Sequence, residues 1–280
     1  MSSLMSTASM ADNFFKGLTT LATVAVLGIV LWLLFGLVVQ GSGDLSLAYL
    51  LTPPQASGLR GGISSVLVST LLILAVCLAV VIPLGLACAL FLTEIVSPAS
   101  PAGKITGYSL DVLSGVPSIV FALFGYQLFA ISLGLGFSVL SGGLTLACMA
   151  LPLMVRTSQQ ALLQVPGNLI EAGHALSLSR TGMLRRVILP AARHGIAAAI
   201  VLSIGRALAE TAVLLFTAGY VLRLPGSLLD SGRALSVHIY DLAMHVPGGQ
   251  GRAATAALVL VALIVLTNLA VHRLLKTHKD

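Results

Sequence analysis

Residues 61–93 read GGISSVLVSTLLILAVCLAVVIPLGLACALFLT, a stretch of 33 residues without Asp, Glu, Lys or Arg. A helix needs about 20 apolar residues to cross the hydrocarbon core of a membrane, and this stretch exceeds that length. Its apolar residues run continuously and do not alternate, which favours a helix over a strand of a membrane barrel. The stretch therefore predicts a long membrane-spanning helix at residues 63–92, with a bend at Pro83.

The composition extends this conclusion to the whole chain of 280 residues. Apolar residues make up 57% and charged residues 9% of the sequence, against about 45–50% and about 25% in soluble domains. The mean hydropathy is +1.04. A soluble domain of this size could not cover its surface with so few charges, which excludes a cytosolic enzyme, a disordered chain and a disulfide scaffold. The sequence predicts an all-α, polytopic membrane protein.

Five further stretches are long and apolar enough to cross a membrane. Residues 112–155 contain 44 residues without a charge, which corresponds to about 66 Å of helix and is enough for two crossings. The Gly/Ser-rich segment 133–143 predicts the break between these two. Loops that contain charged residues separate the remaining stretches from one another. The sequence thus predicts one transmembrane domain over residues 1–280, with six spans at about 18–39, 63–92, 112–132, 139–155, 195–220 and 253–272.

The distribution of basic residues predicts the orientation of these spans. With both termini in the cytoplasm, ten Lys and Arg residues lie inside and four lie outside, while Arg206 falls within a span. Cytoplasmic loops carry an excess of Lys and Arg, so this bias predicts an inner-membrane protein with cytoplasmic N- and C-termini. It also places the long loop at residues 156–193 in the cytoplasm. No segment is long enough to fold as a water-soluble domain, so we expect a partner chain or a gradient to supply energy.

The loop at 156–193 contains short helical stretches separated by Pro and Gly. Such helices are expected to lie along the membrane face and not to cross it. In chain order we expect a short helix near 158–164, a break at 165–167, a helix that starts at the N-cap Asn168, a break at 177–182, and a stop at Pro190 before the fifth span.

The same loop resembles the EAA loop of ABC importer permeases, whose pattern is E-A-A, three residues, G, nine residues and I-x-L-P. The matching positions are Glu171, Ala172, Gly173, Ser177, Leu189 and Pro190. Gly173 stands for the second Ala of the family, and Ser177 stands for the Gly that permits a tight turn. The resemblance implies a type I ABC importer permease fold and a loop that docks on an ATPase subunit. The alternative is an ordinary interfacial loop.

Two further stretches narrow this resemblance to the phosphate importers. Residues 113–125 (LSGVPSIVFALFG) resemble the third span of phosphate importer permeases, and residues 205–219 (GRALAETAVLLFTAG) resemble the fifth. The second stretch is closer to the PstA-type subunit than to its PstC-type paralogue. The resemblance implies a permease that moves inorganic phosphate into the cytoplasm. A permease for sulfate or molybdate is the alternative of the same class, and a secondary transporter or channel is the alternative of another.

The resemblance also implies the partners of the chain. These are a PstC-type permease, an ABC ATPase dimer that binds ATP and Mg, an extracytoplasmic phosphate-binding protein and membrane lipid. Nucleic acid is not expected as a partner. The sequence contains no phosphate-cradling P-loop, so we expect no ATP hydrolysis, no enzymatic activity and no cofactor in this chain itself.

Arg206 and Glu210 form the candidate substrate site. They are four residues apart, which places them about 6 Å apart on one face of a continuous helix. A charge at the centre of a membrane costs at least about 2.5–3.5 kcal/mol, so such residues are expected to pair or to face water. Arg206 would present a guanidinium to a crossing anion, and Glu210 would hold the guanidinium and moderate its affinity. The alternative is a structural salt bridge between neighbouring helices.

Two remaining charged segments have simpler interpretations. The apolar residues at 235–246 recur with helical spacing, with His238, Asp241 and His245 between them. They predict a surface helix in the outer interface, and docking of a binding protein there is the alternative. The two histidines lack a further ligand set and are poor metal candidates. Asp111 is expected to be a solvated charge at the start of the third span.

Overall fold

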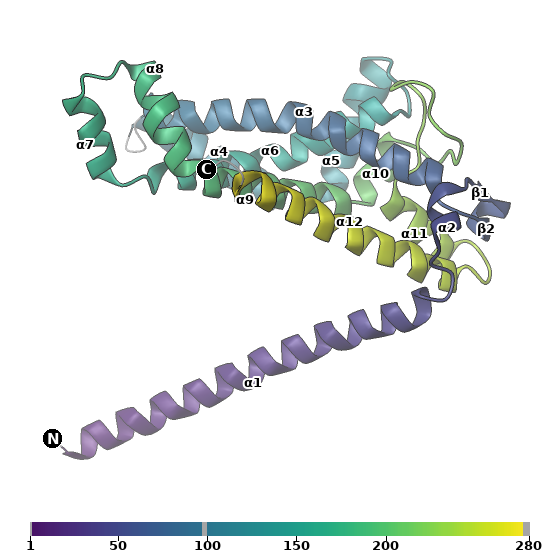
Figure 1. Ribbon diagram of the computed structural model, residues 1–280, viewed down its shortest axis with the longest axis horizontal. Helices are drawn as coiled ribbons and strands as arrows, with labels where there is room; N and C mark the ends of the chain where they lie inside the picture. The colour runs from purple at the N-terminus through teal and green to yellow at the C-terminus, as the bar shows by residue number, and fades with distance from the viewer. Residues whose placement is uncertain (1, 97–99, 277–280) are drawn as a thin grey trace.

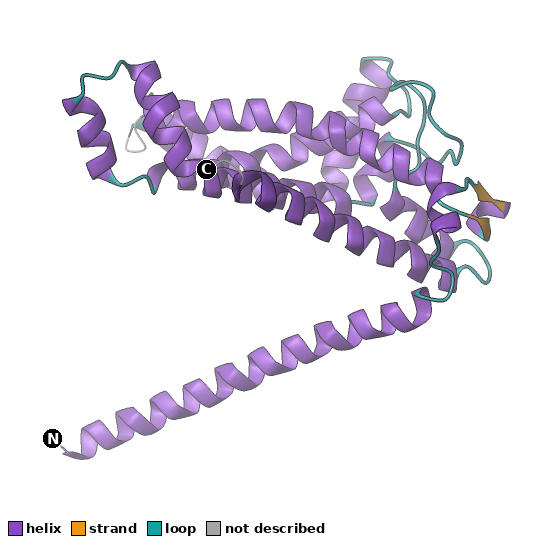
Figure 2. Ribbon diagram, in the orientation of Figure 1, coloured by secondary structure: helices purple, strands orange, loops and turns teal. Residues whose placement is uncertain are grey.

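The chain folds as a bundle of helices (Figures 1 and 2). A computed structural model describes residues 2–96 and 100–276. The long helices are α1 (Ser2–Gly41), α3 (Ser64–Glu94), α6 (Val139–Leu163), α9 (Leu189–Ala209) and α12 (Gln250–Lys276). The shorter helices are α2 (Leu47–Leu51), η1 (Ala56–Gly58), α4 (Pro101–Gly115), α5 (Ser118–Gly125), α7 (Gly167–Ala175), α8 (Arg180–Met183), α10 (Ala212–Thr217) and α11 (Leu235–Met244). Two π-helical segments, η2 (Tyr126–Ser132) and η3 (Leu184–Ile188), and an antiparallel pair of short strands, β1 (Pro54–Gln55) and β2 (Arg60–Gly61), complete the described structure.

Five of the described helical runs are long and apolar enough to cross a membrane. A sixth crossing results if the bent pair formed by α4 and the α5–η2 segment counts as one span. The expected spans at 63–92 and 139–155 lie within α3 and α6, and that at 253–272 lies within α12. The expectation of a single straight helix over 112–132 is wrong, because the chain turns by 97° between Gly115 and Ser118.

Helix α6 forms the centre of the bundle, with α3 and α9 packed against it. The close contact with α3 depends on a small residue at Gly143. A β-carbon at that position would lie 2.5 Å from Cγ1 of Val76 and 3.0 Å from the carbonyl oxygen of Ile73. Small residues allow membrane helices to approach until their backbones nearly touch, which maximises packing where lipid supplies no hydrophobic driving force.

Helix α1 departs from the bundle (Figure 1). The most apolar 18 residues within Phe15–Gly41 include no buried residue, and Trp32 is 71% exposed. The helix meets the bundle at its end, where Gly41 approaches the backbone of Ala254 on α12. The apolar surface of α1 is therefore available to lipid or to another membrane chain.

The two ends of the bundle carry different structures (Figure 1). Helices α7 and α8 lie at one end. Helices α2 and α11 and the two strands lie at the other. The loop at 156–193 and the segment at 235–246 are thus separated by the length of the long helices.

Candidate functional site

The fifth expected span is interrupted inside the bundle. Helix α9 ends at Ala209, and Glu210 has extended backbone angles (φ −77°, ψ 128°) before α10 begins. The prediction of one continuous helix over 195–220 is therefore wrong. The Ser236 hydroxyl donates a 2.6 Å hydrogen bond to the Glu210 carbonyl, so the interruption leaves that acceptor satisfied. Irregular backbone at membrane depth is tolerated where the protein buries it in this way.

Arg206 and Glu210 meet at this interruption as a loose pair. Nη2 of Arg206 lies 4.0 Å from Oε1 of Glu210, the outer limit of an ion pair. The two side chains do not share a helix face as expected, because Glu210 follows the last helical residue. The Arg206 side chain is 37% exposed, against 15% for Glu210. The guanidinium therefore retains donors that an anion could engage.

The stretch at 113–125 is interrupted as well. Pro117 lacks an N–H group and disfavours the helical conformation at the preceding residue, and Val116 indeed has an extended ψ of 129°. Beyond the bend, α5 packs against α10, and its Gly125 lies against Thr145 of α6. Two interrupted helices thus meet on the central helix. Transporters build substrate sites from discontinuous helices of this kind.

Helix α7 carries the first half of the candidate ATPase-docking motif. Glu171 and Ala172 are exposed, whereas Gly173 is buried. Within the part of the chain that the structure describes, the Glu171 side chain makes no hydrogen bond or ion pair. A β-carbon at Gly173 would lie 2.6 Å from Sδ and Cε of Met183. The glycine therefore lets Met183 pack closely against α7, and Glu171 remains available to a partner.

The turn after α7 has left-handed geometry at Ser177, where φ is 50°. The N–H of Ser177 donates to the carbonyl of His174 (2.8 Å), and the N–H of Leu178 donates to the carbonyl of Gly173 (3.1 Å). These two bonds define a Schellman motif, whose left-handed position is usually Gly. The turn expected here is therefore present although serine replaces glycine.

Replacing Ser177 with Gly should stabilise this turn by about 0.5–1 kcal/mol, because a left-handed conformation penalises any residue with a β-carbon. Hydrogen exchange at the Leu178 amide should slow accordingly. Ser179→Ala is the matched control, since the Ser179 hydroxyl accepts from the Gly182 N–H at the start of α8 and its loss should destabilise the turn by about 1 kcal/mol. Unchanged or faster exchange in Ser177→Gly would contradict the assigned geometry.

The loop continues into the next span without a break. Residues 180–209 form one helical run through α8, η3 and α9. Pro190 lies in the first turn of α9, after a π-helical turn in which the Leu189 N–H bonds to the Leu184 carbonyl. The wider turn accommodates the proline ring, which would clash with a carbonyl in a regular helix. The expectation that Pro190 separates the loop from the span is therefore wrong.

Two smaller expectations for this loop also fail. Residues 158–163 are the end of α6 and not a separate helix, because nothing interrupts the helix before Gln164. The N-cap of α7 is Pro166 and not Asn168, since the helix starts at Gly167. The expected break at 165–167 is nevertheless found at this point.

The structure brings the two halves of the motif together. A groove of about 370 Å³ between α7 and the η3–α9 segment is lined by Leu169, Ala172, Gly173, Leu176, Leu178, Arg186, Val187, Pro190 and Ala191. Leu189 packs beside it in an apolar cluster that contains Ile188 and Ala192. Ala172, Gly173 and Pro190 thus share one surface, although they lie on separate helices.

Two contacts that the sequence did not reveal fix this end of the bundle. Nη2 of Arg180 donates a 2.8 Å hydrogen bond to the Glu94 carbonyl, which ties α8 to the last turn of α3. Nη2 of Arg156 lies 2.7 Å from Oδ1 of Asp111. Asp111 is solvated as expected, since its side chain is 63% exposed. Its expected position at the start of a helix is wrong, because it lies in the last part of α4 and pairs with Arg156. Neither contact could be read from sequence, since each joins residues 45 or more positions apart.

At the opposite end of the bundle, His238 and Asp241 of α11 form a largely buried polar cluster with Arg233. The expected helix is present, but His238 is fully buried against Gly58 of η1, so α11 is not a freely exposed surface helix. Burial, aided by the nearby positive charge of Arg233, lowers the pKa of His238 to about 4. Nη1 of Arg233 in turn lies 2.7 Å from Oδ2 of Asp241. No group of three or more potential metal ligands occurs among the described residues.

Helix α9 links the two candidate sites. Pro190 in the groove and Arg206 at the interruption are 16 positions apart on this one helix, which corresponds to about 24 Å. A movement imposed on the groove would therefore reach Arg206 through a continuous backbone.

Comparisons with known proteins agree with this arrangement. The family described as binding-protein-dependent transport system inner membrane component matches residues 81–277. The probable ABC transporter permease protein YqgI of Bacillus subtilis (strain 168) is 31% identical over 277 residues, which cover 92% of this chain and 93% of the relative. The phosphate transport system permease protein PstA 1 of Mycobacterium tuberculosis (strain CDC 1551 / Oshkosh) is 35% identical over 212 residues, which cover 75% of this chain and 69% of the relative.

A solved structure shares the fold. It is a chain of a bacterial ABC transporter involved in the import of the acidic polysaccharide alginate, with a TM-score of 0.62 at 14% identity over 93% of this chain and 96% of that chain. The similarity confirms the expected all-α fold of a type I importer permease. The family match and the relatives together show that the chain belongs to the inner membrane components of binding-protein-dependent transport systems, the permease subunits of ABC transporters.

Proposed function

We propose that this chain is the PstA-type permease subunit of an importer that moves inorganic phosphate into the cytoplasm. The observation that carries the proposal is a loosely paired guanidinium, Arg206, at a helix interruption that α9 joins to the groove beside α7. A guanidinium suits phosphate because it stays protonated and presents a planar fork of donors to two oxygens. The name of the PstA 1 relative, at 35% identity, supports the same substrate.

The energy for transport would come from a separate ATPase dimer that binds ATP and Mg and docks on α7 and α8. Leu169 on α7 and Leu176, which directly follows α7, support this docking, because they are 42% and 75% exposed. A PstC-type permease would complete the membrane pathway. An extracytoplasmic phosphate-binding protein would deliver phosphate at the end that carries α11, in keeping with the family description.

This assignment places α7 and both termini in the cytoplasm, as the excess of basic residues at that end predicts. Single cysteines can test it after the native Cys77, Cys88 and Cys148 are replaced by Ala. We choose Arg223→Cys and Leu176→Cys, because both positions are exposed. A membrane-impermeant maleimide added to intact cells should label only the cysteine at 223. Labelling at 176, with or without labelling at 223, would reject the orientation.

The substrate can be tested with the four purified subunits reconstituted in liposomes. We expect ATP-driven uptake of radiolabelled phosphate that an excess of unlabelled phosphate abolishes and that equal sulfate or molybdate leaves largely unchanged. A complex with an inactive ATPase is the control. Uptake of sulfate or molybdate in preference to phosphate would favour the other oxyanion permeases, and uptake driven by an ion gradient without ATP would favour a secondary transporter.

A further inference from the structure

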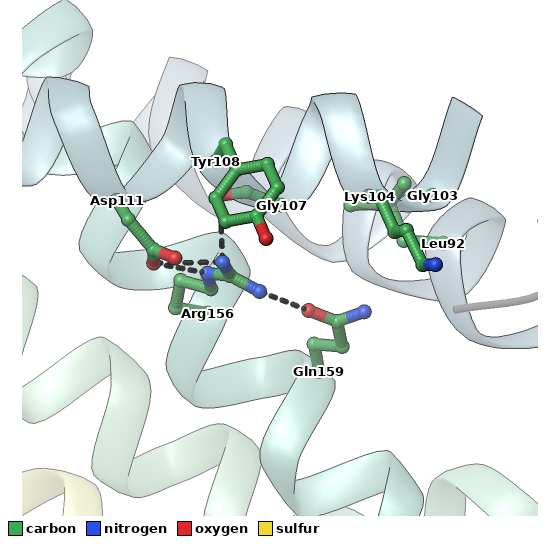
Figure 3. A pocket seen from close by; sticks show the side chains of 8 residues that line it. All are labelled: Leu92, Gly103, Lys104, Gly107, Tyr108, Asp111, Arg156 and Gln159. Atoms are coloured by element: carbon green, nitrogen blue, oxygen red, sulfur yellow. Dashed lines mark hydrogen bonds and ion pairs between the residues drawn. The ribbon is translucent and has the colours of Figure 1, made fainter. Parts of the chain in front are cut away.

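A second polar site lies near the end of the bundle that carries α7 and α8. It is separate from Arg206 and from the groove beside α7. It is a pocket of about 230 Å³ between the end of α3, α4 and α6 (Figure 3). Its lining residues are Leu92, Gly103, Lys104, Gly107, Tyr108, Asp111, Arg156 and Gln159. Leu92 lies two positions before Glu94, whose carbonyl binds Arg180 of α8. The pocket therefore opens near the end of the bundle that carries α7 and α8.

Arg156 builds one wall of this pocket and is occupied by protein groups. Its Nε donates to Oδ1 of Asp111 (3.0 Å), its Nη2 to the Gly107 carbonyl (2.6 Å) and its Nη1 to Oε1 of Gln159 (3.3 Å). The carboxylate of Asp111 offsets the charge of Arg156. This network joins α4 to α6 and leaves little of the guanidinium for a ligand.

The network orients further donors into the pocket. Because arginine can only donate, the Gln159 amide must turn its oxygen to Arg156, and its Nε2 then points away. Figure 3 shows this nitrogen on the side of Arg156 where Lys104 lies, whereas the Tyr108 hydroxyl lies above the Arg156 guanidinium. The Lys104 side chain makes no ion pair or hydrogen bond with another described residue. The pocket thus offers an ammonium, an amide and a hydroxyl, and no carboxylate among the described residues pairs with the charge of Lys104.

We propose that this pocket binds a phosphate group through Nζ of Lys104, Nε2 of Gln159 and the hydroxyl of Tyr108. A phosphate group presents acceptor oxygens in several directions. Its negative charge would pair with the Lys104 ammonium, for which the described residues offer no ionic partner. The group could belong to inorganic phosphate or to an anionic phospholipid. For a lipid, the exposed side chains of Ile105 and Val112 on α4 offer apolar surface to the acyl chains. Binding follows from the pocket itself, and only its cytoplasmic position rests on the proposed function.

The reactivity of Lys104 toward a soluble acetylating reagent tests this proposal on the intact complex. In phosphatidylcholine nanodiscs without phosphate, Lys104 should be acetylated readily. Addition of about 10 mM inorganic phosphate should slow this reaction roughly tenfold, as expected for a site with a dissociation constant of about 1 mM. In phosphate-free nanodiscs with phosphatidylglycerol, slower acetylation would identify the lipid as the source. Lys16, exposed on α1, is the internal control for the phosphate arm and should change little there.

Variants separate binding from general shielding. Gln159→Leu and Tyr108→Phe should each weaken the protection of Lys104, whereas Tyr126→Phe, which removes a hydroxyl in η2, should not. Sodium chloride at matched ionic strength should give no protection. The proposal is wrong if neither phosphate nor phosphatidylglycerol slows acetylation, or if Gln159→Leu and Tyr108→Phe leave the protection intact. It is also wrong if Lys104 is already unreactive in the phosphate-free complex, because another subunit then fills the pocket. None of these readouts requires transport, so they stand independently of the uptake assay.

Discussion

Replacing Arg206 with Gln should reduce ATP-driven phosphate uptake by about 10- to 150-fold, because a hydrogen bond to a charged group contributes about 1.5–3 kcal/mol. The complex should still assemble. The pair with Glu210 is only a 4.0 Å contact, and the backbone turn at Glu210 is held by the Ser236 hydroxyl and not by the guanidinium. Initial uptake rates in liposomes, normalised to the amount of assembled complex, measure the effect.

Arg206→Lys should recover only part of the lost uptake. An ammonium keeps the positive charge but cannot offer two parallel donors to a phosphate group. A structural role predicts a different order, in which Lys restores nearly full activity because charge balance with Glu210 is all that matters. The ranking of wild type, Lys and Gln therefore distinguishes recognition of an anion from maintenance of charge.

The double variant Arg206→Gln with Glu210→Gln decides between the two roles. If the pair is structural, removing both charges should restore assembly and uptake together. If Arg206 serves the anion, assembly stays normal and uptake stays low, because no cation remains to meet the substrate. Uptake near the wild-type rate in the double variant would reject the pathway role of Arg206.

The sequence predicts the long helices of this chain because membrane crossing depends on local composition. The length of the apolar stretches predicted the helices α3, α6 and α12, and the Pro and Gly residues of the loop predicted the break before α7. The bend at Pro117 also has a local cause, since proline excludes the helical conformation at Val116. It was missed because the apolar stretch 112–132 is long enough to cross as one helix.

Other features depend on contacts between distant residues and have no local signal. The interruption at Glu210 contains neither Pro nor Gly, and its carbonyl is satisfied by Ser236, 26 positions away. Helical spacing placed His238 on a polar face, but η1 covers that face and buries it. The spacing of a short sequence motif identified the candidate docking residues. The structure adds that Ala172, Gly173 and Pro190 line one groove.

Replacing Glu171 with Lys should reduce co-purification of the ATPase subunit and lower phosphate uptake at least about tenfold, while the permease itself folds normally. The fold should survive because the Glu171 side chain is exposed and makes no hydrogen bond or ion pair with another described residue. Association should suffer because Leu169 on α7 and Leu176 just after it are exposed as well, so a partner that covers these side chains would also desolvate Glu171. Loss of one member of a buried charged pair costs about 2–5 kcal/mol, mainly through faster dissociation.

The size of the loss should depend on the charge at this position. Glu171→Gln keeps the shape and should weaken association less than Glu171→Lys, which places a cation where the ATPase would meet a carboxylate. Arg60→Glu at the opposite end of the bundle reverses a charge as well, and it should leave ATPase co-purification unchanged. Because α9 joins the groove to Arg206, a complex that retains weak ATPase binding should still lose uptake in proportion to that binding. Normal co-purification and normal uptake in Glu171→Lys would remove α7 from the docking surface, and they would leave the groove without the partner that its exposed leucines are proposed to meet.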